Sequence, residues 1–242
     1  MSAARDSTVV PVTDAPVEGE PTAFVQRRYE VPPGATDLLL VRHGASAAYV
    51  EGAPFSLVDG HGDPPLSADG LAQAELVSAR LAAARIGAIY VTNLRRTAET
   101  AAPLAARLGV DVRVEADLRE VNLGEWEGGI FRKNVADGHP ISLRMLAEER
   151  WDVIPGAESS AALAGRVQAA IERIAAAHPG QRVAAFTHGG VIGQALALAS
   201  GSRPFAFLGA ENTSISRLVI TADRWIVRSF NDTAHLDGVA AA

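Results

Sequence analysis

Short, continuous apolar runs that alternate with longer amphipathic segments set the strongest limit on how this chain folds. The runs lie at residues 37–41, 86–91, 110–114 and 182–186, and segments with apolar residues at helical spacing lie at 67–81, 94–108, 159–178 and 191–199. A strand that is apolar along its whole length is typical of a parallel sheet covered on both faces. The order of the segments therefore predicts an α/β fold, a three-layer sandwich whose mostly parallel central sheet carries helices on both faces.

The remaining segments predict the boundaries of this fold. Two further strands, at 214–220 and 225–230, are expected to form a hairpin at the sheet edge. Residues 124–157 contain two Trp, several charges and scattered Gly, so we expect a small cap insertion of mixed helix and loop there. The Gly- and Pro-rich stretch 52–65 is expected to hold no regular element. Residues 36–242 are thus expected to form a single domain.

The N-terminal region differs from the rest in composition. Residues 1–22 lack the basic start and the long apolar stretch of a secretory signal, so residues 1–35 are expected to be a flexible tail. No apolar run approaches the roughly 18 to 20 residues of a membrane-spanning helix. We therefore expect a cytoplasmic protein with no membrane partner.

Charge and cysteine content exclude several classes of function. The 242 residues carry 22 Lys and Arg against 28 Asp and Glu, a net charge of −6, without a basic block. Nucleic acid and anionic membranes are therefore not expected as partners. The absence of cysteine excludes disulfides, a thiolate nucleophile and cysteine-based zinc sites.

Two of the predicted buried strands end at a histidine, in Arg42-His43-Gly44 and in Thr187-His188-Gly189-Gly190. The carboxyl ends of parallel strands share one edge of the sheet, where ligands bind, so we expect His43 and His188 to share a site. A guanidinium matches phosphate oxygens, and a neutral imidazole can act as a nucleophile. The pattern indicates phosphoryl chemistry, although each motif alone also fits a chance tripeptide or a buried core histidine.

A third polar segment, Thr92–Ala101, opens a helix directly after the strand at 86–91. Backbone amides at a helix N-terminus favour an anion, and Arg96 would add a positive charge there. The alternative is that Arg95 and Arg96 are solvated surface charges, with Arg96 pairing with Glu99. Taken alone, this segment favours solvated surface charges.

Carboxylates follow the third strand, at Glu120, Glu125 and Glu127. A sheltered carboxyl group at this place could donate a proton to a leaving alkoxide, and Glu120 is the candidate. Glu125 and Glu127 fit structural or solvated positions better. His61, in the stretch 52–65, either reaches the substrate or is a solvated loop histidine, and the solvated interpretation is favoured.

Taken in order, these motifs resemble the histidine phosphatase superfamily, also called phosphoglycerate mutase-like. The resemblance spans about residues 37–230 and rests on Leu39-Leu40-Val41-Arg42-His43-Gly44, Pro65-Leu66-Ser67 with Gly70 and Gln73, Thr92–Ala101, Leu118–Gly128 and Thr187-His188-Gly189-Gly190. Each motif is short, but five of them in the family's order are specific.

The resemblance implies a role for each matched residue. His43 would be the nucleophile that forms a phosphohistidine, and Glu120 would donate a proton to the leaving group. The phosphate pocket would consist of Arg42, Ser46, Arg96, His188 and Gly189. In the family's pattern the arginine two places after the leucine binds phosphate, which selects Arg96 over Arg95. The family uses no metal and no other cofactor, and the six histidines of this chain form no ligand cluster in the sequence.

Three functional hypotheses follow. The first is a metal-independent phosphomonoesterase that hydrolyses a small phosphorylated metabolite through a phosphohistidine. The second is phosphoglycerate mutase-type phosphoryl transfer, which needs extra basic residues in the cap, where Arg132, Lys133 and Arg144 are the candidates. The third is a catalytically silent phosphate-ligand or protein-binding module, which has no need for both a nucleophile and an acid. A homo-oligomer is compatible with the sequence, which does not decide the oligomeric state.

Overall fold

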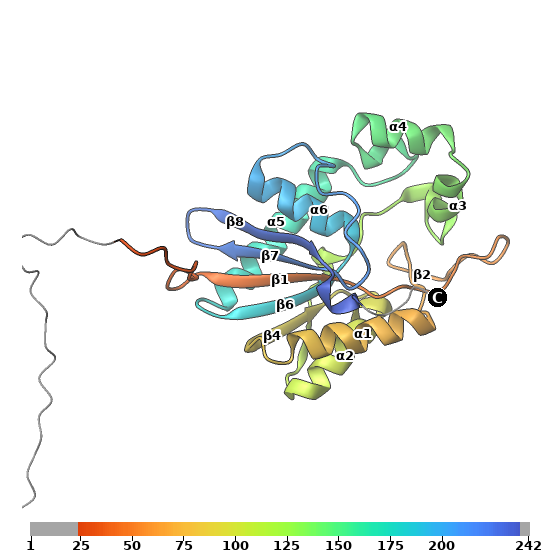
Figure 1. Ribbon diagram of the computed structural model, residues 1–242. Coiled ribbons are helices and arrows are strands. Elements are labelled where there is room, and N and C mark those ends of the chain that lie inside the picture. The colour runs from red at the N-terminus through yellow and green to blue at the C-terminus, as the bar shows by residue number, and fades with distance from the viewer. Residues whose placement is uncertain (1–23, 238–242) are drawn as a thin grey trace, which may run out of the picture. The chain divides into compact units, whose positions relative to one another are not determined.

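The computed structural model describes residues 24–237 of the chain (Figure 1). The described residues fall into two units, 31–237 and 24–30. Every helix and strand given below belongs to the first of these units, and residues 24–30 contain neither. The flexible tail predicted for residues 1–35 falls mostly on residues 1–23, which lie outside the described part of the chain.

A six-stranded, mostly parallel sheet forms the centre of the folded unit. Its strands are β1 (Thr36–Arg42), β4 (Ile86–Val91), β5 (Val112–Val114), β6 (Arg182–Thr187), β7 (Ile215–Ile220) and β8 (Trp225–Asp232). They lie in the order β5-β4-β6-β1-β7-β8. β1 and β4 both pair in parallel with β6, whereas β7 runs antiparallel to β1 and β8. The predicted parallel sheet is confirmed, as is the hairpin β7–β8 at its edge.

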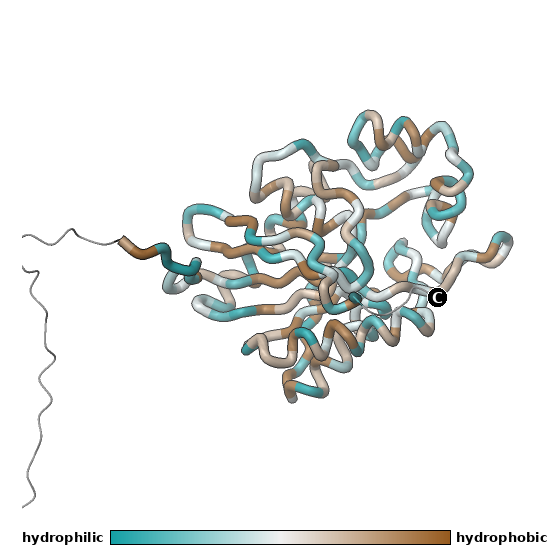
Figure 2. The backbone as a smooth tube through the Cα atoms, in the orientation of Figure 1, coloured by the Kyte–Doolittle hydropathy of each residue, from teal (hydrophilic) through white to brown (hydrophobic). Residues whose placement is uncertain are grey.

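Helices cover both faces of the sheet. α1 (Ala68–Leu81) and α2 (Arg95–Leu108) lie on one face, and α5 (Ser160–Ala177) and α6 (Gly189–Ser200) lie on the other (Figure 1). Hydrophobic segments run along the strands, whereas α1 and α2 alternate between hydrophobic and hydrophilic residues (Figure 2). This is the three-layer α/β sandwich that the sequence predicts.

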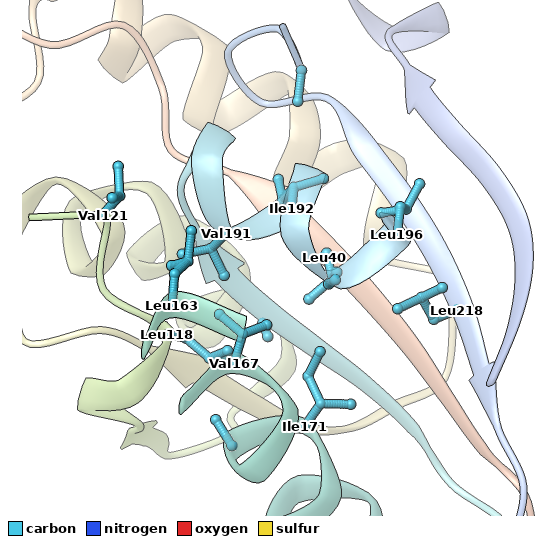
Figure 3. Close-up of a cluster of buried hydrophobic side chains, with 14 of the residues drawn as sticks. Leu40, Leu118, Val121, Leu163, Val167, Ile171, Val191, Ile192, Leu196 and Leu218 are labelled. Atoms are coloured by element: carbon cyan, nitrogen blue, oxygen red, sulfur yellow. The ribbon is translucent and has the colours of Figure 1, made fainter. Parts of the chain in front are cut away.

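The strand β1 explains why both faces are covered. Successive side chains of a strand point to opposite faces of the sheet. Leu38 and Leu40 pack in the cluster that includes α5 and α6, in which Figure 3 shows Leu40. Leu39 and Val41 pack in the cluster that includes α1 and α2. All four are buried. An apolar run without alternation is thus the pattern that this sandwich requires.

The stretch 52–65 contains regular structure that the sequence analysis did not expect. Leu57–Val58 (β2) and His61–Gly62 (β3) pair antiparallel as a small hairpin. Its turn consists of Asp59 and Gly60, whose φ angles are 47° and 79°. Asp-Gly is the pair that favours a two-residue hairpin turn, because both central residues need positive φ. The expectation of an irregular loop was therefore wrong.

The region 124–157 is a mixed helical insertion, as predicted from its composition. It contains α3 (Ile130–Ala136), α4 (Pro140–Glu148) and 3₁₀ turns at Gly124–Trp126 and Trp151–Val153. Trp126, Met145 and Trp151 are buried and join the core cluster that includes α5 and α6. Further 3₁₀ turns lie at Ala116–Leu118 and Ala234–Leu236. Within residues 24–237, the helices are too short or too polar to cross a bilayer.

Candidate active site

The carboxyl ends of three neighbouring strands hold the residues that the sequence singles out. Arg42 ends β1 and is followed by His43, Thr92 follows β4, and His188 follows β6. Since these strands are parallel, their ends meet at one edge of the sheet. A cavity of about 210 Å³ opens there. Its lining includes Arg42, His43, His61, Arg96, Glu120, Glu127 and Arg132.

The loop after β1 is held against the start of α1 by a close backbone contact. A Cβ atom at Gly70 would lie 1.9 Å from the carbonyl oxygen of Ala45, so only glycine fits this position. The backbone amide of Ala45 also donates to Oε1 of Gln73 at 2.8 Å, and that of Gly44 donates to Oγ1 of Thr100 at 3.0 Å. Gly70 and Gln73 in the sequence motif therefore shape the loop that carries His43.

The hydrogen bond of His43 sets the tautomer of its imidazole. Nδ1 lies 2.7 Å from the carbonyl oxygen of Gly44, and a carbonyl can only accept, so Nδ1 carries the proton in the neutral ring. The lone pair is then on Nε2. Burial, reinforced by the charges of Arg96 and Arg42, holds the pKa of His43 well below 6.5. The ring is therefore neutral at physiological pH, which is the state that a nucleophile requires.

His188 is fully buried and lies beside His43, with ring centroids 5.2 Å apart. Its Nδ1 accepts a hydrogen bond from Nη2 of Arg96 at 3.1 Å, because a guanidinium can only donate. Nε2 then carries the proton and donates to Oγ1 of Thr92 at 3.1 Å. Burial and the neighbouring charge of Arg96 hold the pKa of His188 well below its ordinary value. Both ring nitrogens thus have protein partners, and a role of His188 in binding phosphate stays a prediction.

Arg95 and Arg96, adjacent at the start of α2, lie in opposite environments. Arg96 is 7% exposed and lines the cavity, where Nη1 donates to the carbonyl of Gly62 at 2.9 Å. Burial lowers the pKa of Arg96 to about 10, so the side chain is charged at neutral pH. Arg95 is instead the exposed residue and pairs with Glu99 at 2.9 Å. Arg96, not Arg95, is therefore the guanidinium that the fold brings to the site.

Arg42 completes the positive wall of the cavity. Its Nη1 donates to the carbonyl of Ala210 at 2.5 Å, and its Nε is buried without a partner. A Cβ atom at Gly189 would lie 3.5 Å from this Nε, which is an ordinary van der Waals distance. Burial lowers the pKa of Arg42 from its usual value. A buried donor without a partner is the feature expected of a group that binds an anion.

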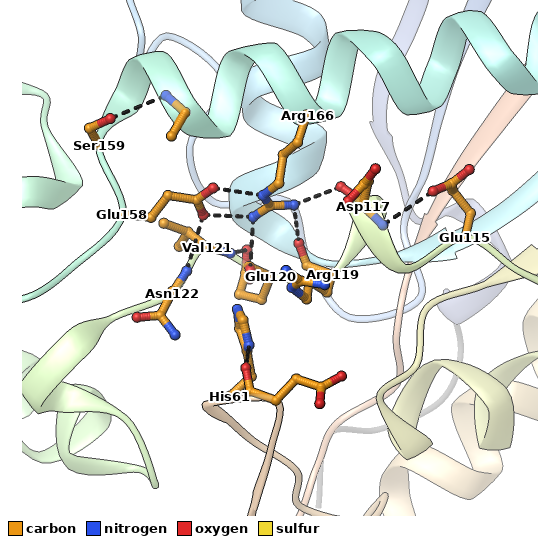
Figure 4. Close-up of polar contacts among 12 residues, drawn as sticks. His61, Glu115, Asp117, Arg119, Glu120, Val121, Asn122, Glu158, Ser159 and Arg166 are labelled. Atoms are coloured by element: carbon orange, nitrogen blue, oxygen red, sulfur yellow. Dashed lines mark hydrogen bonds and ion pairs between the residues drawn. The ribbon is translucent and has the colours of Figure 1, made fainter.

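Glu120 also lines the cavity and lies four residues before the helical insertion at 124–157. Its Oε1 accepts hydrogen bonds from the backbone amides of Gly190 at 3.1 Å and Val121 at 3.0 Å. The backbone of the same segment is held by Arg166 of α5, whose guanidinium donates to the carbonyls of Asp117, Arg119 and Glu120 (Figure 4). These contacts hold the Glu120 carboxylate at the cavity wall.

Arg166 is a residue that the sequence analysis missed. Besides the three carbonyls it pairs with Glu158 at 2.7 Å, and both side chains are at least 86% buried since their exposed fractions are 13% and 14%. The available signal was one of the two arginines of α5, which lies beside the apolar stripe between Leu163 and Val167. That position resembles any solvated helix face, because the partners are backbone carbonyls that no sequence pattern marks.

Two of the predicted phosphate ligands, Ser46 and Gly189, lie outside the lining of the cavity. Ser46 is not among the residues that line the cavity, and its Oγ accepts a hydrogen bond from Nη2 of Arg132 at 2.6 Å. Gly189 opens α6 beside Arg42 and is likewise absent from the lining. Arg132, from α3 of the cap, does line the cavity and lies over the ring of Phe55, 5.4 Å from its centroid. It supplies a third guanidinium that the site prediction did not include.

The cavity is suited to an anion. Three guanidiniums, of Arg42, Arg96 and Arg132, face two carboxylates, of Glu120 and Glu127, and the His43 ring is neutral. The Glu127 carboxylate is occupied by the backbone amides of Gly62 and Leu123. Among residues 24–237, no group of three or more His, Asp or Glu side chains is arranged to hold a metal ion. A wider hollow of about 700 Å³ near α5 and the β7–β8 turn contains none of the predicted site residues.

Comparison with known proteins agrees with these motifs. Residues 38–233 match the model of the histidine phosphatase superfamily, branch 1. The chain is 33% identical over 208 residues to phosphoglycerate mutase-like protein 4 of Arabidopsis thaliana, covering 83% of this chain and 87% of the relative. It is 32% identical over 209 residues to the metal-independent phosphoserine phosphatase of the same plant, covering 84% of each chain.

Solved structures give the same assignment. A mycobacterial glucosyl-3-phosphoglycerate phosphatase superposes with a TM-score of 0.69 and 28% identity, over 82% of this chain and 100% of that one. The family match covers most of the chain and includes every strand of the central sheet except the first two residues of β1. The prediction of an enzyme of this type is thereby confirmed. The chain belongs to the histidine phosphatase superfamily, branch 1.

Proposed function

We propose that the protein is a metal-independent phosphomonoesterase that hydrolyses a small organic phosphate through a phosphohistidine at His43. The observation that carries this proposal is the hydrogen bond from Nδ1 of His43 to the Gly44 carbonyl, which leaves the lone pair on Nε2. This nucleophilic tautomer lies in a cavity that also holds three guanidiniums and the Glu120 carboxyl group. The names of two relatives, a metal-independent phosphoserine phosphatase and a glucosyl-3-phosphoglycerate phosphatase, support a phosphate monoester as substrate.

The first chemical step transfers the phosphoryl group to the protein. Nε2 of His43 attacks phosphorus, an N–P bond forms, and the bond to the ester oxygen breaks in line with the attack. Arg42 and Arg96 neutralise the charge on the remaining phosphoryl oxygens, as phosphoryl transfer requires. The carboxyl group of Glu120 donates its proton to the departing alkoxide, which leaves as the free alcohol.

The second step restores the enzyme. The carboxylate that Glu120 has become accepts a proton from water, and the water oxygen attacks phosphorus. The N–P bond breaks, the electron pair returns to Nε2 of His43, and inorganic phosphate is released. One water is consumed for each ester cleaved, so protons and charges balance over the cycle.

Phosphoglycerate mutase activity is the second candidate, favoured by the name of the mutase-like relative. A mutase needs basic cap residues that bind a second anionic group. Of the three candidates, Lys133 pairs with Asp137 at 2.6 Å and Arg144 pairs with Glu148 at 2.6 Å, whereas Arg132 lines the cavity. A single cap arginine at the cavity gives less support to a bisphosphate intermediate than to a monoester. A phosphate-binding module without activity is the third candidate.

Phosphate release from 4-nitrophenyl phosphate tests the proposal. We expect hydrolysis by the wild-type chain without added metal and its loss in His43→Ala, whereas His235→Ala, outside the cavity, keeps the wild-type rate. Equal rates for His43→Ala and wild type would leave only the binding module. Interconversion of 2- and 3-phosphoglycerate that depends on added 2,3-bisphosphoglycerate, at a rate above phosphate release, would favour the mutase instead.

A further inference from the structure

A second histidine faces the same cavity and has no task in the two steps above. His61 lies in β3, is 5% exposed and belongs to the cavity lining. Its Nε2 is buried and has no hydrogen-bond partner. The structure thus corrects the expectation of a solvated loop histidine. A buried polar atom without a partner costs free energy, and a ligand that enters the cavity beside it can supply the missing partner.

The chemistry of this free nitrogen follows from the other side of the ring. Nδ1 of His61 lies 2.9 Å from the carbonyl oxygen of Asp59, which can only accept. In the neutral ring Nδ1 therefore carries the proton, and Nε2 presents a lone pair. The natural partner of that lone pair is a hydroxyl or ammonium group, because both donate hydrogen bonds.

The hairpin holds the imidazole in place on several sides. The Gly62 amide donates to Oε2 of Glu127 at 2.7 Å, and the Gly60 carbonyl accepts from Nδ2 of Asn122 at 3.1 Å. The Gly62 carbonyl also accepts from Arg96. Contacts on both sides of His61 thus connect it to the cap segment and to the phosphate-facing arginine. A group held in this way contacts a ligand without losing much conformational freedom.

Its place in the cavity is on the side of the proton donor. Figure 4 shows the ring of His61 extending from the hairpin toward the segment of Glu120 and Asn122, with the bonded nitrogen on the hairpin side. In the mechanism above, Glu120 protonates the leaving oxygen. In that mechanism the alcohol part of the substrate lies beside Glu120, on the side toward which the His61 ring extends, and the phosphoryl group is bound by Arg42 and Arg96.

We propose that Nε2 of His61 accepts a hydrogen bond from a hydroxyl or ammonium group on the alcohol part of the substrate. The natural substrate is then a phosphate ester of a hydroxylated or amino-bearing alcohol rather than of a plain alkyl or aryl alcohol. This inference rests on the proposed phosphatase function and specifies the substrate class of the same site.

Matched pairs of esters test the contact. sn-Glycerol 3-phosphate is compared with propyl phosphate, and O-phosphoethanolamine with ethyl phosphate, so that each pair differs in its hydrogen-bond donors. We expect the wild type to prefer the donor-bearing ester of at least one pair by roughly tenfold in kcat/KM, the worth of about one hydrogen bond. His61→Leu should bring that ratio close to one, and His61→Gln, whose amide oxygen can accept, should keep part of it. Because each ratio compares two esters in the same variant, a general loss of activity cancels from it.

The outcomes separate this inference from the proposed function. The same ratio within each pair in wild type and His61→Leu would overturn the role of His61 while leaving the phosphatase intact. So would the absence of any wild-type preference within both pairs. Absence of phosphate release from every ester would instead overturn the proposed function. In that case the dissociation constants of the same four alkyl esters are measured by calorimetry. The role of His61 is overturned if His61→Leu leaves the ratio of the two dissociation constants within each pair unchanged.

Discussion

Nη2 of Arg96 donates a hydrogen bond to Nδ1 of His188, 3.1 Å away, although the two residues are 92 positions apart in the sequence. The contact determines the tautomer of His188, because the ring nitrogen that faces a guanidinium must accept. It also gives Arg96 two tasks, since Nη1 donates to the Gly62 carbonyl at the same time. Removing this one side chain should therefore affect both the phosphate-binding wall and the neighbouring imidazole.

Arg96→Ala should lower kcat/KM for phosphate esters by roughly ten- to a hundredfold, the worth of one charge-assisted hydrogen bond of about 1.5–3 kcal/mol. Arg95→Ala is the matched control and should stay within about threefold of wild type, because Arg95 forms an exposed pair with Glu99. The pKa of His188, followed by NMR, should rise in Arg96→Ala, since burial and then the Arg96 charge hold it down. Equal rates in the two variants would contradict the assignment of Arg96.

Glu120→Gln should separate substrates by the quality of their leaving groups. An alkyl phosphate needs protonation of the departing oxygen, so its turnover should fall by about 10² to 10⁴, whereas 4-nitrophenyl phosphate should lose much less. The matched control is Glu125→Gln, which changes an exposed carboxylate five residues further along the chain and should leave both substrates unaffected. Equal losses on the two substrates would be inconsistent with a proton donor at position 120.

Arg166→Leu should destabilise the fold far more than Arg173→Leu, although both arginines belong to α5 and each pairs with carboxylates. Arg166 and Glu158 are largely buried, and removal of one partner from a buried pair costs about 3–5 kcal/mol. The Arg173 side chain is 50% exposed, so its loss should cost about 1 kcal/mol or less. Free energies of unfolding in urea measure both. Similar values would show that the contacts of Arg166 with residues 117–120 contribute little.

Stability should fall as the pH falls through about 6.5. The pKa values of His43 and His188 lie well below 6.5 in the folded state, because burial and the nearby guanidiniums disfavour the charged rings. The unfolded chain then binds more protons below this pH, and each histidine removes up to about 1.4 kcal/mol of unfolding free energy per pH unit. Above pH 6.5 the contribution is fully present.

Urea denaturation across this range, in wild type and in His188→Gln, measures the effect. The half-buried His235, whose pKa burial also lowers, contributes to the slope in both proteins. The difference between the two slopes therefore isolates position 188, and His188→Gln should give the shallower dependence. An identical slope in the two proteins would mean that His188 titrates normally in the folded state.

Local patterns were sufficient to predict most of the framework. The strand at 86–91 was expected with the bounds that it has, and Gly109 ends α2 with a φ of 63°, as its place after Leu108 predicts. These features depend on neighbouring residues, which a sequence pattern records directly. The small hairpin at 57–62 was missed because many turn formers in a row concealed the one pair, Asp59-Gly60, that specifies a tight turn.

The parts of the site that could not be predicted depend on contacts between distant segments. Beside the buried His61, the Gly62 amide is held by the Glu127 carboxylate, which lies 65 positions after Gly62 in the sequence. Arg132 reaches the cavity because its guanidinium bonds to the Ser46 hydroxyl and the Ala47 carbonyl. Neither residue follows a strand or opens a helix with a recognisable motif. Arg42, His43 and His188, in contrast, follow strands whose common edge a parallel sheet dictates.

Trapping the covalent intermediate is the most direct test of the account. The wild-type chain is mixed with a ³²P-labelled phosphate ester and quenched in alkali, and the labelled peptide is identified. We expect acid-labile, alkali-stable label on the peptide that contains His43, and none in His43→Ala. Phosphate release without label on any histidine, or label on the peptide that contains His188, would contradict the proposed nucleophile.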